Sequence, residues 1–459
     1  MIAILDIGKT NKKALVFNSE YEVIFETSVV LNETQDEDGD PCENIQALRL
    51  WVLNTIQDLM QDTRFDIRAI NFSAYGASFV LLDAAGNLVA PLYNYLKPLD
   101  SGFLHQFCEN YGGEKQLAVQ TSSPILGNLN SGIQLYRLKK IKPEIFQSVK
   151  LALHLPQYLA YLFTQLPCSD LTSIGCHTLL WDFKKQDYHP WVYRESIDQV
   201  LAPVMPSSET LSVEFGGRTI SCGIGLHDSS AALIPYLASI KDPFILLSTG
   251  TWCIALNPFN DQELKPEELD QDCLCYLSFQ GKPVKASRLF SGHEHEEQVS
   301  RIAAHFAVPE DFYQNLSLDS FTDLRIQHQK VEPVINSSGL KQSGFENRML
   351  DQFNHAEEAY HVLISDLVRI QVVSLNLVQG PNPVKTIFID GGFSKNKIYM
   401  QMFANALEGF QVFAASLAQA SALGVALAIH PYWNETPIPD QLIKTIPYYP
   451  FLRPEKNSE

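Results

Sequence analysis

Two short polar turns, far apart in the chain, carry residue types that bind phosphate and a divalent cation. The first turn follows the apolar run IAIL and contains Asp6, Gly8, Lys9, Thr10, Asn11 and Lys13. Mg²⁺ prefers one or two carboxylates together with water and phosphate oxygens, and lysine offers a point charge to a phosphoryl group. In the second turn, residues 248–251, hydroxyl and backbone N–H groups are suited to the same phosphates.

The two turns repeat one design. IAILDIGKTNKKALVF and FILLSTGTWCIAL each read as an apolar strand, a polar turn with a glycine, and a second apolar strand. Gly8 and Gly250 hold matching places, where the missing Cβ lets backbone approach a phosphate. Either turn alone is also compatible with an ordinary β-hairpin. The pairing predicts two copies that face each other across a nucleotide cleft, with Thr251 beside Gly250.

A third glycine turn lies between the strand TIFI and the helix KIYMQMFANAL. It contains Gly391, Gly392 and Asn396, and its glycines permit a flat adenine or ribose to lie against backbone. The turn lacks G-x-G-x-x-G spacing, which disfavours a dinucleotide fold. A purely structural strand-to-helix turn is the alternative.

Asp228 stands at the start of a predicted helix in GIGLHDSSAAL. Position alone favours a helix cap, and removal of a cap costs about 1 kcal/mol of stability. The same carboxylate is suited to act as a base on a substrate hydroxyl, and loss of a base costs roughly 10² to 10⁴ in rate.

Strand and helix patterns alternate along the chain, which predicts an α/β fold with two domains. We expect a first domain over 1–240, with a helical insertion over 103–165 that lines a cleft, and a second domain over 241–446. A long helix is predicted from about 353 to 379, and a poorly tied tail over 447–459. LVAPLYNYL, residues 88–96, is read as a continuation of the strands.

Composition narrows the function class. The formal net charge of −18, with a pI near 5.1, argues against nucleic-acid or anionic-membrane partners. The eight cysteines show no metal-binding spacing, so a reduced, cytoplasmic setting is expected. We expect no signal peptide and no membrane span, because the chain opens on an apolar strand pattern and no run approaches the roughly 18 apolar residues that a span needs.

Four motifs in this order resemble the FGGY carbohydrate kinases: DIGKTNKK, GLHDSSAAL, STGTW and DGGFSKN. That family belongs to the actin, Hsp70 and hexokinase superfamily of two ribonuclease H-like domains. The resemblance implies that Asp228 is the general base, that Asp6 holds Mg²⁺, and that the Gly8–Lys13 segment with Gly250 and Thr251 contacts ATP phosphates. It assigns adenosine to Gly391, Gly392 and Asn396.

AYGASFVLLDAAGNLVAPLYNY and LPQYLAYLFT resemble the rhamnulokinase branch, with L-fuculose kinases a close second. The sugar contacts then fall on Gly76, Ala77, Ser78, His227 and Ser229. Four positions differ from the residues that the resemblance leads us to expect. Ser78 stands where rhamnulokinase-like sequences carry an acidic residue, Gln419 replaces a glutamate, and Lys9 replaces a small residue. The 288–298 segment lacks an expected tryptophan. The sugar and the hydroxyl that is phosphorylated therefore stay open.

The run from His293 to Glu296 offers two histidines and two acids, but i and i+2 positions diverge on a helix and no further ligand is evident. We expect a solvated or cleft-facing loop, with Glu294 as a candidate for sugar recognition. The predicted activity is phosphorylation of a small-molecule sugar by ATP after closure of the lobes. The alternatives are a catalytically silent sugar- and nucleotide-binding regulator and an Hsp70-like ATPase, and a homodimer is left open.

Overall fold

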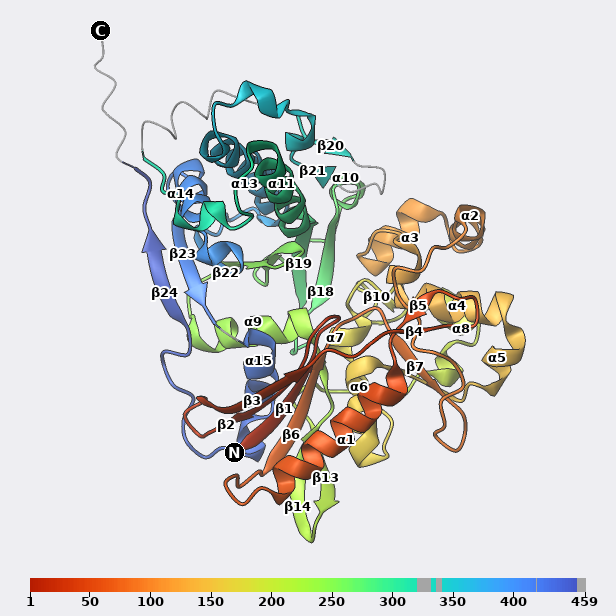
Figure 1. Cartoon of the computed structure of the whole chain (residues 1–459). Helices are drawn as coiled ribbons and strands as arrows, with labels where there is room; N and C mark the ends of the chain where they lie inside the picture. The colour runs from red at the N-terminus through yellow and green to blue at the C-terminus, as the bar shows by residue number, and fades with distance from the viewer. Residues whose placement is uncertain (320–331, 336–340, 418, 452–459) are drawn as a thin grey trace.

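Two α/β domains, each built on its own sheet, make up the chain (Figure 1). The structure is a computed structural model of the whole chain, and it describes residues 1–319, 332–335, 341–417 and 419–451. The first sheet has the order β13-β14-β6-β1-β2-β3, with β15 also paired to β6. Its strands are β1 (Ile2–Ile7), β2 (Lys12–Phe17), β3 (Val23–Val29), β6 (Ala69–Ala74), β13 (Thr210–Phe215), β14 (Arg218–Gly223) and β15 (Leu226–His227).

The second sheet has the order β18-β19-β17-β16-β22-β23-β24. Its strands are β16 (Ile245–Thr249), β17 (Cys253–Asn257), β18 (Cys273–Leu277), β19 (Pro283–Leu289), β22 (Thr386–Gly391), β23 (Gln411–Ser416) and β24 (Lys444–Tyr448). The run β3-β2-β1-β6-β14 and the run β19-β17-β16-β22-β23 share one pattern of two antiparallel and then two parallel pairings. The duplication predicted from the two glycine turns is therefore present in the topology.

Side-chain caps set where several first-domain helices begin. Asn44 accepts a hydrogen bond from the Ala47 N–H at the start of α1, and Asp100 accepts one from Phe103 at the start of α2. The helices are α1 (Ile45–Gln61), α2 (Ser101–Asn110), α3 (Glu114–Thr121), α4 (Ser131–Ile141), α5 (Pro143–Ser148), α6 (Leu155–Thr164), α7 (Leu171–Ile174) and α8 (Pro190–Arg194). Most of the predicted helical insertion, α2 to α5, stands to one side of the sheet (Figure 1).

Short strand pairs join these elements. They are β4 (Thr34–Gln35) with β5 (Pro41–Cys42), β7 (Phe79–Leu82) with β8 (Leu151–His154), β9 (Ser169–Asp170) with β12 (Val204–Met205), and β10 (Trp181–Asp182) with β11 (Asp187–Tyr188). In the second domain β20 (Val334–Ile335) pairs with β21 (Lys341–Gln342). The second-domain helices are α10 (Pro266–Leu269), α11 (Ser291–Phe306), α13 (Ala356–Val378) and α14 (Lys397–Ala406).

Two helices, α9 (Asp228–Ser239) and α15 (Ala420–Ala428), cross between the sheets (Figure 1). A Cβ on Gly424 of α15 would lie 1.9 Å from the Ala231 carbonyl oxygen of α9, so this crossing requires glycine. One side of α9 packs with α15 against the first sheet, and its other side packs against the second sheet. The chain passes from α9 to β16 across residues 240–244.

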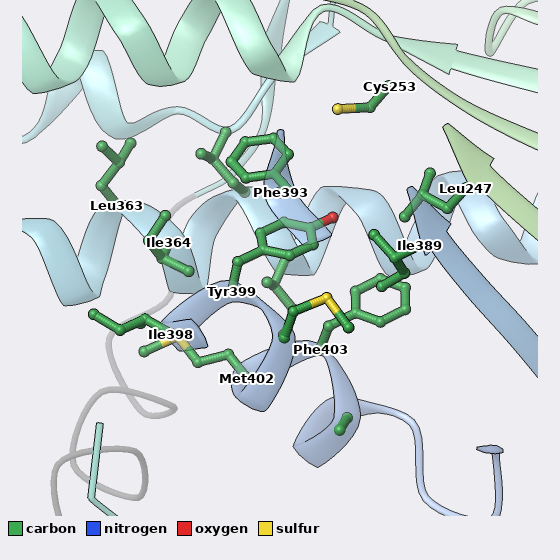
Figure 2. Packing of buried hydrophobic residues seen from close by; sticks show 14 of the residues in the cluster. Leu247, Cys253, Leu363, Ile364, Ile389, Phe393, Ile398, Tyr399, Met402 and Phe403 are labelled. Atoms are coloured by element: carbon green, nitrogen blue, oxygen red, sulfur yellow. The ribbon is translucent and has the colours of Figure 1, made fainter. Parts of the chain in front are cut away.

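An aromatic stack anchors the second core. Figure 2 shows Tyr399 of α14 among Phe393, Phe403 and the apolar side chains of α13. The Tyr399 ring lies 4.3 Å from that of Phe393 and 5.8 Å from that of Phe403. Phe393 immediately follows Gly391 and Gly392, so its packing in the second-domain core holds the third glycine turn in place.

Several predicted boundaries are corrected. The tail does not begin at residue 447, because Pro447 and Tyr448 pair with β23 as part of β24, and Phe451 donates its N–H to Asn405; residues 452–459 lie outside the described part. Residues 88–96 form only isolated bridges, since an extended run without a partner strand is not a strand. The 291–306 segment is a helix and not a loop.

One described helix, α13, has the length and composition of a membrane span, contrary to the sequence estimate. In its most apolar window, 67% of the residues are buried inside the second domain.

Candidate active site

Asp228 lies where the strand β15 turns into α9, and the preceding loop is held from three sides. The Gly225 N–H donates to Asn71 Oδ1 at 3.2 Å, and Gln157 Nε2 donates to the Gly225 carbonyl at 2.7 Å. Gly225 adopts φ +80°, and a Cβ there would lie 2.4 Å from the Pro156 carbonyl oxygen, so only glycine fits. Asn71 also donates to the Val425 carbonyl of α15. The loop before Asp228 is therefore rigid.

Asp228 is not the N-cap of α9. It is the first helical residue, and His227 occupies the cap position without a capping hydrogen bond from its side chain. Asp228 Oδ1 accepts the Ser229 N–H at 2.6 Å and the Ser229 hydroxyl at 3.3 Å. Burial raises the pKa of Asp228 to about 6. A carboxylate that is costly to ionise and does not cap its helix is a candidate base.

Asp6 is at the end of β1, and its pKa is also raised to about 6, first by burial and then by the charge of Asp228. Because the charge of Asp228 raises the pKa of Asp6, the two carboxylates lie close enough to interact electrostatically. Ser73, the register partner of Asp6 on β6, has a buried hydroxyl close enough to the Asp6 carboxylate to lower its pKa. A buried carboxylate with a second carboxylate beside it suits a hydrated Mg²⁺, so the residues present fit the expected metal.

No cluster of three or more His, Cys, Asp or Glu side chains that could hold a metal occurs within the described ranges. All eight cysteines are free and buried. Asp6 is the carboxylate assigned to the metal, and Mg²⁺ commonly keeps water and phosphate oxygens as its other ligands.

The first glycine turn is a tight hairpin between β1 and β2. The Gly8 N–H donates to the Asn11 carbonyl at 3.0 Å, and a Cβ on Gly8 would meet that oxygen. Lys9 Nζ pairs with Glu33 at 2.9 Å, and Thr10 and Asn11 are exposed.

Lys13 lies opposite Asp6 in the β1–β2 register. Its Nζ contacts Gln419 Oε1 at 3.1 Å and Glu26 at 3.3 Å, and Gln419 Nε2 donates to Glu26 at 2.9 Å. Gln419, which departs from the family pattern, thus bridges the second half of the chain to this turn. Lys9 and Lys13 are both engaged by partners that an incoming phosphate would have to replace.

The second and third glycine turns are fused. Gly391 pairs with Thr249, adopts φ +91°, and would place a Cβ 1.9 Å from the Thr249 carbonyl oxygen. The Gly392 N–H donates to the same oxygen at 2.7 Å, and Thr249 Oγ1 accepts the Phe393 N–H at 3.0 Å. Gly391 therefore serves close backbone approach, and Gly392 is the glycine that faces a cavity.

That cavity, of about 630 Å³, lies between the glycine turns, the start of α11 and the start of α14. Its lining includes the predicted residues Gly250, Thr251, Gly392 and Asn396. The remaining lining residues are Gly292, His295, Glu296, Tyr313, Gln314, Leu316, Phe393, Lys395, Lys397 and Ile398. Aromatic and apolar walls with two lysines at one side suit a nucleotide base with its phosphates.

Asn396 lines the cavity, but its polar atoms have structural partners. Its Oδ1 accepts the N–H groups of Ile398 and Tyr399 and so caps α14, and its Nδ2 donates to the Tyr360 hydroxyl at 2.7 Å. The predicted contact with adenosine would therefore have to use this side chain's surface and not its hydrogen bonds.

Two of the predicted sugar residues of the first domain, His227 and Ser229, flank Asp228, and Gly76 packs against the His227 ring. A Cβ on Gly76 would lie 3.0 Å from the His227 ring, and Ala77 adopts φ +57° while its carbonyl accepts from Gln134. Ser78 is buried, and its hydroxyl has no partner in the described ranges. Ser229 is half-buried and bound to Asp228.

The placement of Glu294 argues against its predicted role in sugar recognition. Its side chain is buried on α11, and both carboxylate oxygens accept the Ser343 N–H at 3.0 Å. Burial raises the pKa of Glu294 to about 7. The Glu294 carboxylate is directed toward Ser343 of the second domain and not toward the first. The next two residues of α11, His295 and Glu296, line the nucleotide cavity.

Sequence reasoning missed residues that act through packing. A Cβ on Gly292 would lie 1.8 Å from the Gly250 carbonyl oxygen, so α11 can begin against the phosphate turn only at a glycine. The Ser-Gly pair at 291–292 was the available signal. The rings of His295 and Tyr313 lie 5.2 Å apart. His295 belongs to the 293–296 run that was weighed as a metal or sugar site and not as a nucleotide wall, and Tyr313 lies in a segment without a motif.

Comparisons with known proteins agree with this geometry. Residues 1–232 match the model of the FGGY family of carbohydrate kinases, N-terminal domain, and residues 241–437 match carbohydrate kinase FGGY, C-terminal domain. An L-fuculokinase from Escherichia coli is 23% identical over 282 residues, and a rhamnulokinase from Halalkalibacterium halodurans is 22% identical over 263 residues. The aligned part spans about half of each of these relatives, 56% and 54% of their lengths, and the same shares of this chain.

Solved structures match over nearly the whole chain. A ligand-bound xylulose kinase from Lactobacillus acidophilus superposes with a TM-score of 0.80 at 16% identity, covering 98% of this chain and 94% of that one. A carbohydrate kinase from Novosphingobium aromaticivorans gives a TM-score of 0.78 at 20% identity, covering 98% and 96%. At identities this low, the solved structures establish only the shared fold. The family assignment rests on the two domain models, which together match residues 1–232 and 241–437. The chain belongs to the FGGY family of carbohydrate kinases.

Proposed function

We propose that the chain transfers the terminal phosphoryl group of ATP to a hydroxyl of a ketose or deoxyketose such as L-rhamnulose or L-fuculose. The observation that carries this proposal is the pair Asp6 and Asp228, whose pKa values are both raised to about 6 at the junction of the two lobes. A nucleotide-sized cavity opens on the facing lobe. One lobe thus offers a base and the other a phosphate donor site.

In the transfer step, Asp228 takes the proton from the sugar hydroxyl. The sugar oxygen forms a bond to the γ-phosphorus, the bond from that phosphorus to the bridging oxygen breaks, and ADP leaves with the electron pair. A base with a pKa near the working pH is mostly ionised yet still basic enough to accept a proton. Phosphoryl transfer depends mainly on positioning and electrostatics, so the rigid loop before Asp228 matters as much as its basicity.

Mg²⁺, held by Asp6 directly or through water, would offset the charge of the phosphate oxygens. Lys9 and Lys13 are the cations nearest this turn, and each exchanges a carboxylate or amide partner for phosphate when ATP binds. From the second lobe, Gly250 and Thr251 line the cavity, and Thr251 offers its hydroxyl to the same phosphates, whereas the Gly250 N–H is held by the Trp252 carbonyl at 2.9 Å.

The adenosine is assigned to the 630 Å³ cavity. Gly392 presents backbone there, Phe393 and Tyr313 supply ring faces, and Lys395 and Lys397 supply charge. Apolar walls with a few polar groups at one end are typical of a site that holds a base and orients its phosphates.

The sugar class rests on the relatives, which include an L-fuculokinase and rhamnulokinases. The departure at Ser78 supports no particular sugar, because this side chain is buried. The deoxyketose class is therefore the working proposal, and the named sugars are its first two members.

A coupled assay of ADP release would test the proposal. Wild-type protein is incubated with Mg·ATP and, separately, L-rhamnulose, L-fuculose, L-ribulose, D-xylulose or glycerol, with Asp228→Asn as the control. We expect sugar-dependent turnover on at least one deoxyketose that the Asn variant lacks. Turnover on none of these sugars would contradict the proposal and would favour a silent binding protein.

A further inference from the structure

We propose that Gln419 is a positioning residue for ATP binding, whose neutral amide stands between Lys13 and Glu26 and keeps the Lys13 ammonium available to a phosphate oxygen. The inference rests on the proposed kinase function, in which Lys13 contacts the phosphates of ATP. It gives the side chain at position 419, which departs from the family pattern, a role of its own.

The Gln419 amide contacts a cation with one end and a carboxylate with the other. Lys13 Nζ donates to Gln419 Oε1 at 3.1 Å, and Gln419 Nε2 donates to Glu26 Oε1 at 2.9 Å. An ammonium only donates and a carboxylate only accepts, so the two neighbours fix which end of the amide faces which group. The side chain at 419 must therefore be a donor and an acceptor at once, as an amide is.

This arrangement keeps the two charges from bonding directly. Lys13 Nζ lies 3.3 Å from Glu26 Oε1, near enough for attraction. Within the described part of the chain, however, the hydrogen bond of Lys13 goes to Gln419 and not to Glu26. A carboxylate carries a full negative charge and holds an ammonium more tightly than an amide oxygen does. An incoming phosphate therefore competes with the weaker of the two partners.

Lys13 is open to an anion on the side of the proposed metal. Its side chain is 31% exposed, and that of Glu26 is 40% exposed. Lys13 lies directly opposite Asp6 in the β1–β2 register, so the two side chains share one face of the sheet. An ammonium has three N–H donors, so a single amide partner leaves donors for phosphate oxygens.

The backbone at Gln419 indicates that this residue serves through its side chain and not as a cap. Gln419 is the N-cap of α15, yet its side chain makes no capping hydrogen bond. It adopts φ +71° and ψ 36°, a left-handed conformation that disfavours a residue with a Cβ and that glycine adopts freely. Strain of this kind at a residue with specific side-chain contacts points to a function for the side chain.

The helix that carries Gln419 is fixed on two sides. Against α9, Gly424 approaches so closely that a Cβ would lie 1.9 Å from the Ala231 carbonyl oxygen. On its other side Ala422 belongs with Leu15 of β2 to one buried apolar cluster. The start of α15 is thus held against the strand that carries Lys13, although the two positions are 406 residues apart in the chain.

Binding of Mg·ATP, measured by isothermal titration calorimetry without sugar, tests the proposal independently of turnover. Gln419→Gly removes the amide, and Gln419→Glu replaces it with a carboxylate of the same shape. Glu26→Gln removes the competing charge, alone and combined with Gln419→Gly. Gln165→Gly is the matched control, because Gln165 is also a glutamine at positive φ, +54°, and its amide donates to carbonyls of its own helix α6.

We expect Gln419→Gly to weaken the Kd for Mg·ATP about fivefold, because Lys13 then bonds to Glu26 directly and a charged partner is harder to replace than a neutral one. Gln419→Glu should weaken the Kd at least as much, since it places a carboxylate beside Lys13. Glu26→Gln should bind within about twofold of the wild type or more tightly, and adding Gln419→Gly to it should change the Kd by no more than about twofold.

The control and the stability measurements separate positioning from a structural role. Gln165→Gly should bind Mg·ATP within about twofold of the wild type, because its amide lies outside the phosphate turn. Both glycine variants should melt within about 3 °C of the wild type, because glycine tolerates the positive φ at each position.

Four results would overturn the inference: unchanged ATP binding in Gln419→Gly, wild-type binding in Gln419→Glu, no recovery in the double variant, or a Gln419→Gly that melts well below Gln165→Gly. If Gln419→Gly does not fold, Gln419→Glu decides, since weaker binding supports the inference and wild-type binding overturns it. A wild type that binds ATP but turns over no sugar would overturn the proposed function and leave this comparison intact, whereas a wild type that does not bind ATP would overturn both.

Discussion

The two faces of the proposed site are built by different means. On the first lobe, Asp6 and Asp228 are titratable side chains whose pKa values are both raised by burial, and the charge of Asp228 raises the pKa of Asp6 further. On the second lobe, the nucleotide cavity is shaped by glycines whose missing Cβ atoms let Thr249 and Gly250 carbonyls approach within 1.9 and 1.8 Å of where a Cβ would stand. Reactivity is encoded in charged groups and binding in close packing. Substitutions should therefore remove catalysis in the first lobe and stability in the second.

The strongest test of this contrast is Asp228→Asn. Loss of the general base should lower kcat about 10²- to 10⁴-fold, while the free energy of unfolding should not fall, because an amide is not penalised by burial as a charge is. Sugar-dependent ADP release and thermal melting measure the two quantities side by side. A variant that keeps more than a tenth of the activity, or that melts well below the wild type, would contradict the assignment of Asp228 to catalysis and not to stability.

Gly391→Ala tests the packing side. An alanine there must adopt φ +91° and overlap the Thr249 carbonyl, so we expect a loss of at least about 1–3 kcal/mol from backbone strain alone. Gly392→Ala is the matched control for stability, because its Cβ would lie 3.8 Å from the same oxygen at an ordinary φ of −63°. Urea unfolding of both variants gives the difference. Equal stabilities would mean that the two turns are not fused as described.

The sequence predicts the reactive side chains of the site better than the residues that shape its cavity. Asp6, Asp228 and the four motifs were visible because chemistry restricts those positions to few residue types, and the duplicated sheets were visible in the repeated strand-turn-strand pattern. The places of Gly292, His295 and Tyr313 in the cavity wall were not visible, because such walls come together only when segments distant in the chain pack. Glu294 was misplaced for a related reason: without the helical phase of 291–306, the sequence could not show that Glu294 is directed to Ser343 while the next residue, His295, lines the cavity.

The pH dependence of stability tests the raised pKa values of the two first-lobe carboxylates. In the absence of Mg²⁺ and ATP, the folded-state pKa values of Asp6 and Asp228 are about 6, above the ordinary value of 3.8. Between these values the unfolded chain binds fewer protons than the folded one at these two sites, so their contribution to stability should fall as pH rises from about 4 to about 6. The two groups titrate as a coupled pair. Chemical unfolding across this range, compared with Asp228→Asn, should show a smaller fall in the variant. An equal fall in both proteins would mean that Asp228 does not take part.

The smallest expected effect concerns Asn396, where the sequence and the structure suggest different roles. As the cap of α14 it should contribute about 1 kcal/mol to stability, so Asn396→Ala should destabilise the chain by that amount while the KM for ATP changes little. Asn396→Asp keeps the acceptor for the Ile398 and Tyr399 N–H groups and should melt close to the wild type. If Asn396→Ala instead raised the KM for ATP tenfold without loss of stability, the side chain would be a nucleotide ligand. The second lobe would then carry binding energy in a polar group, and the division between reactive charges and close packing would no longer hold there.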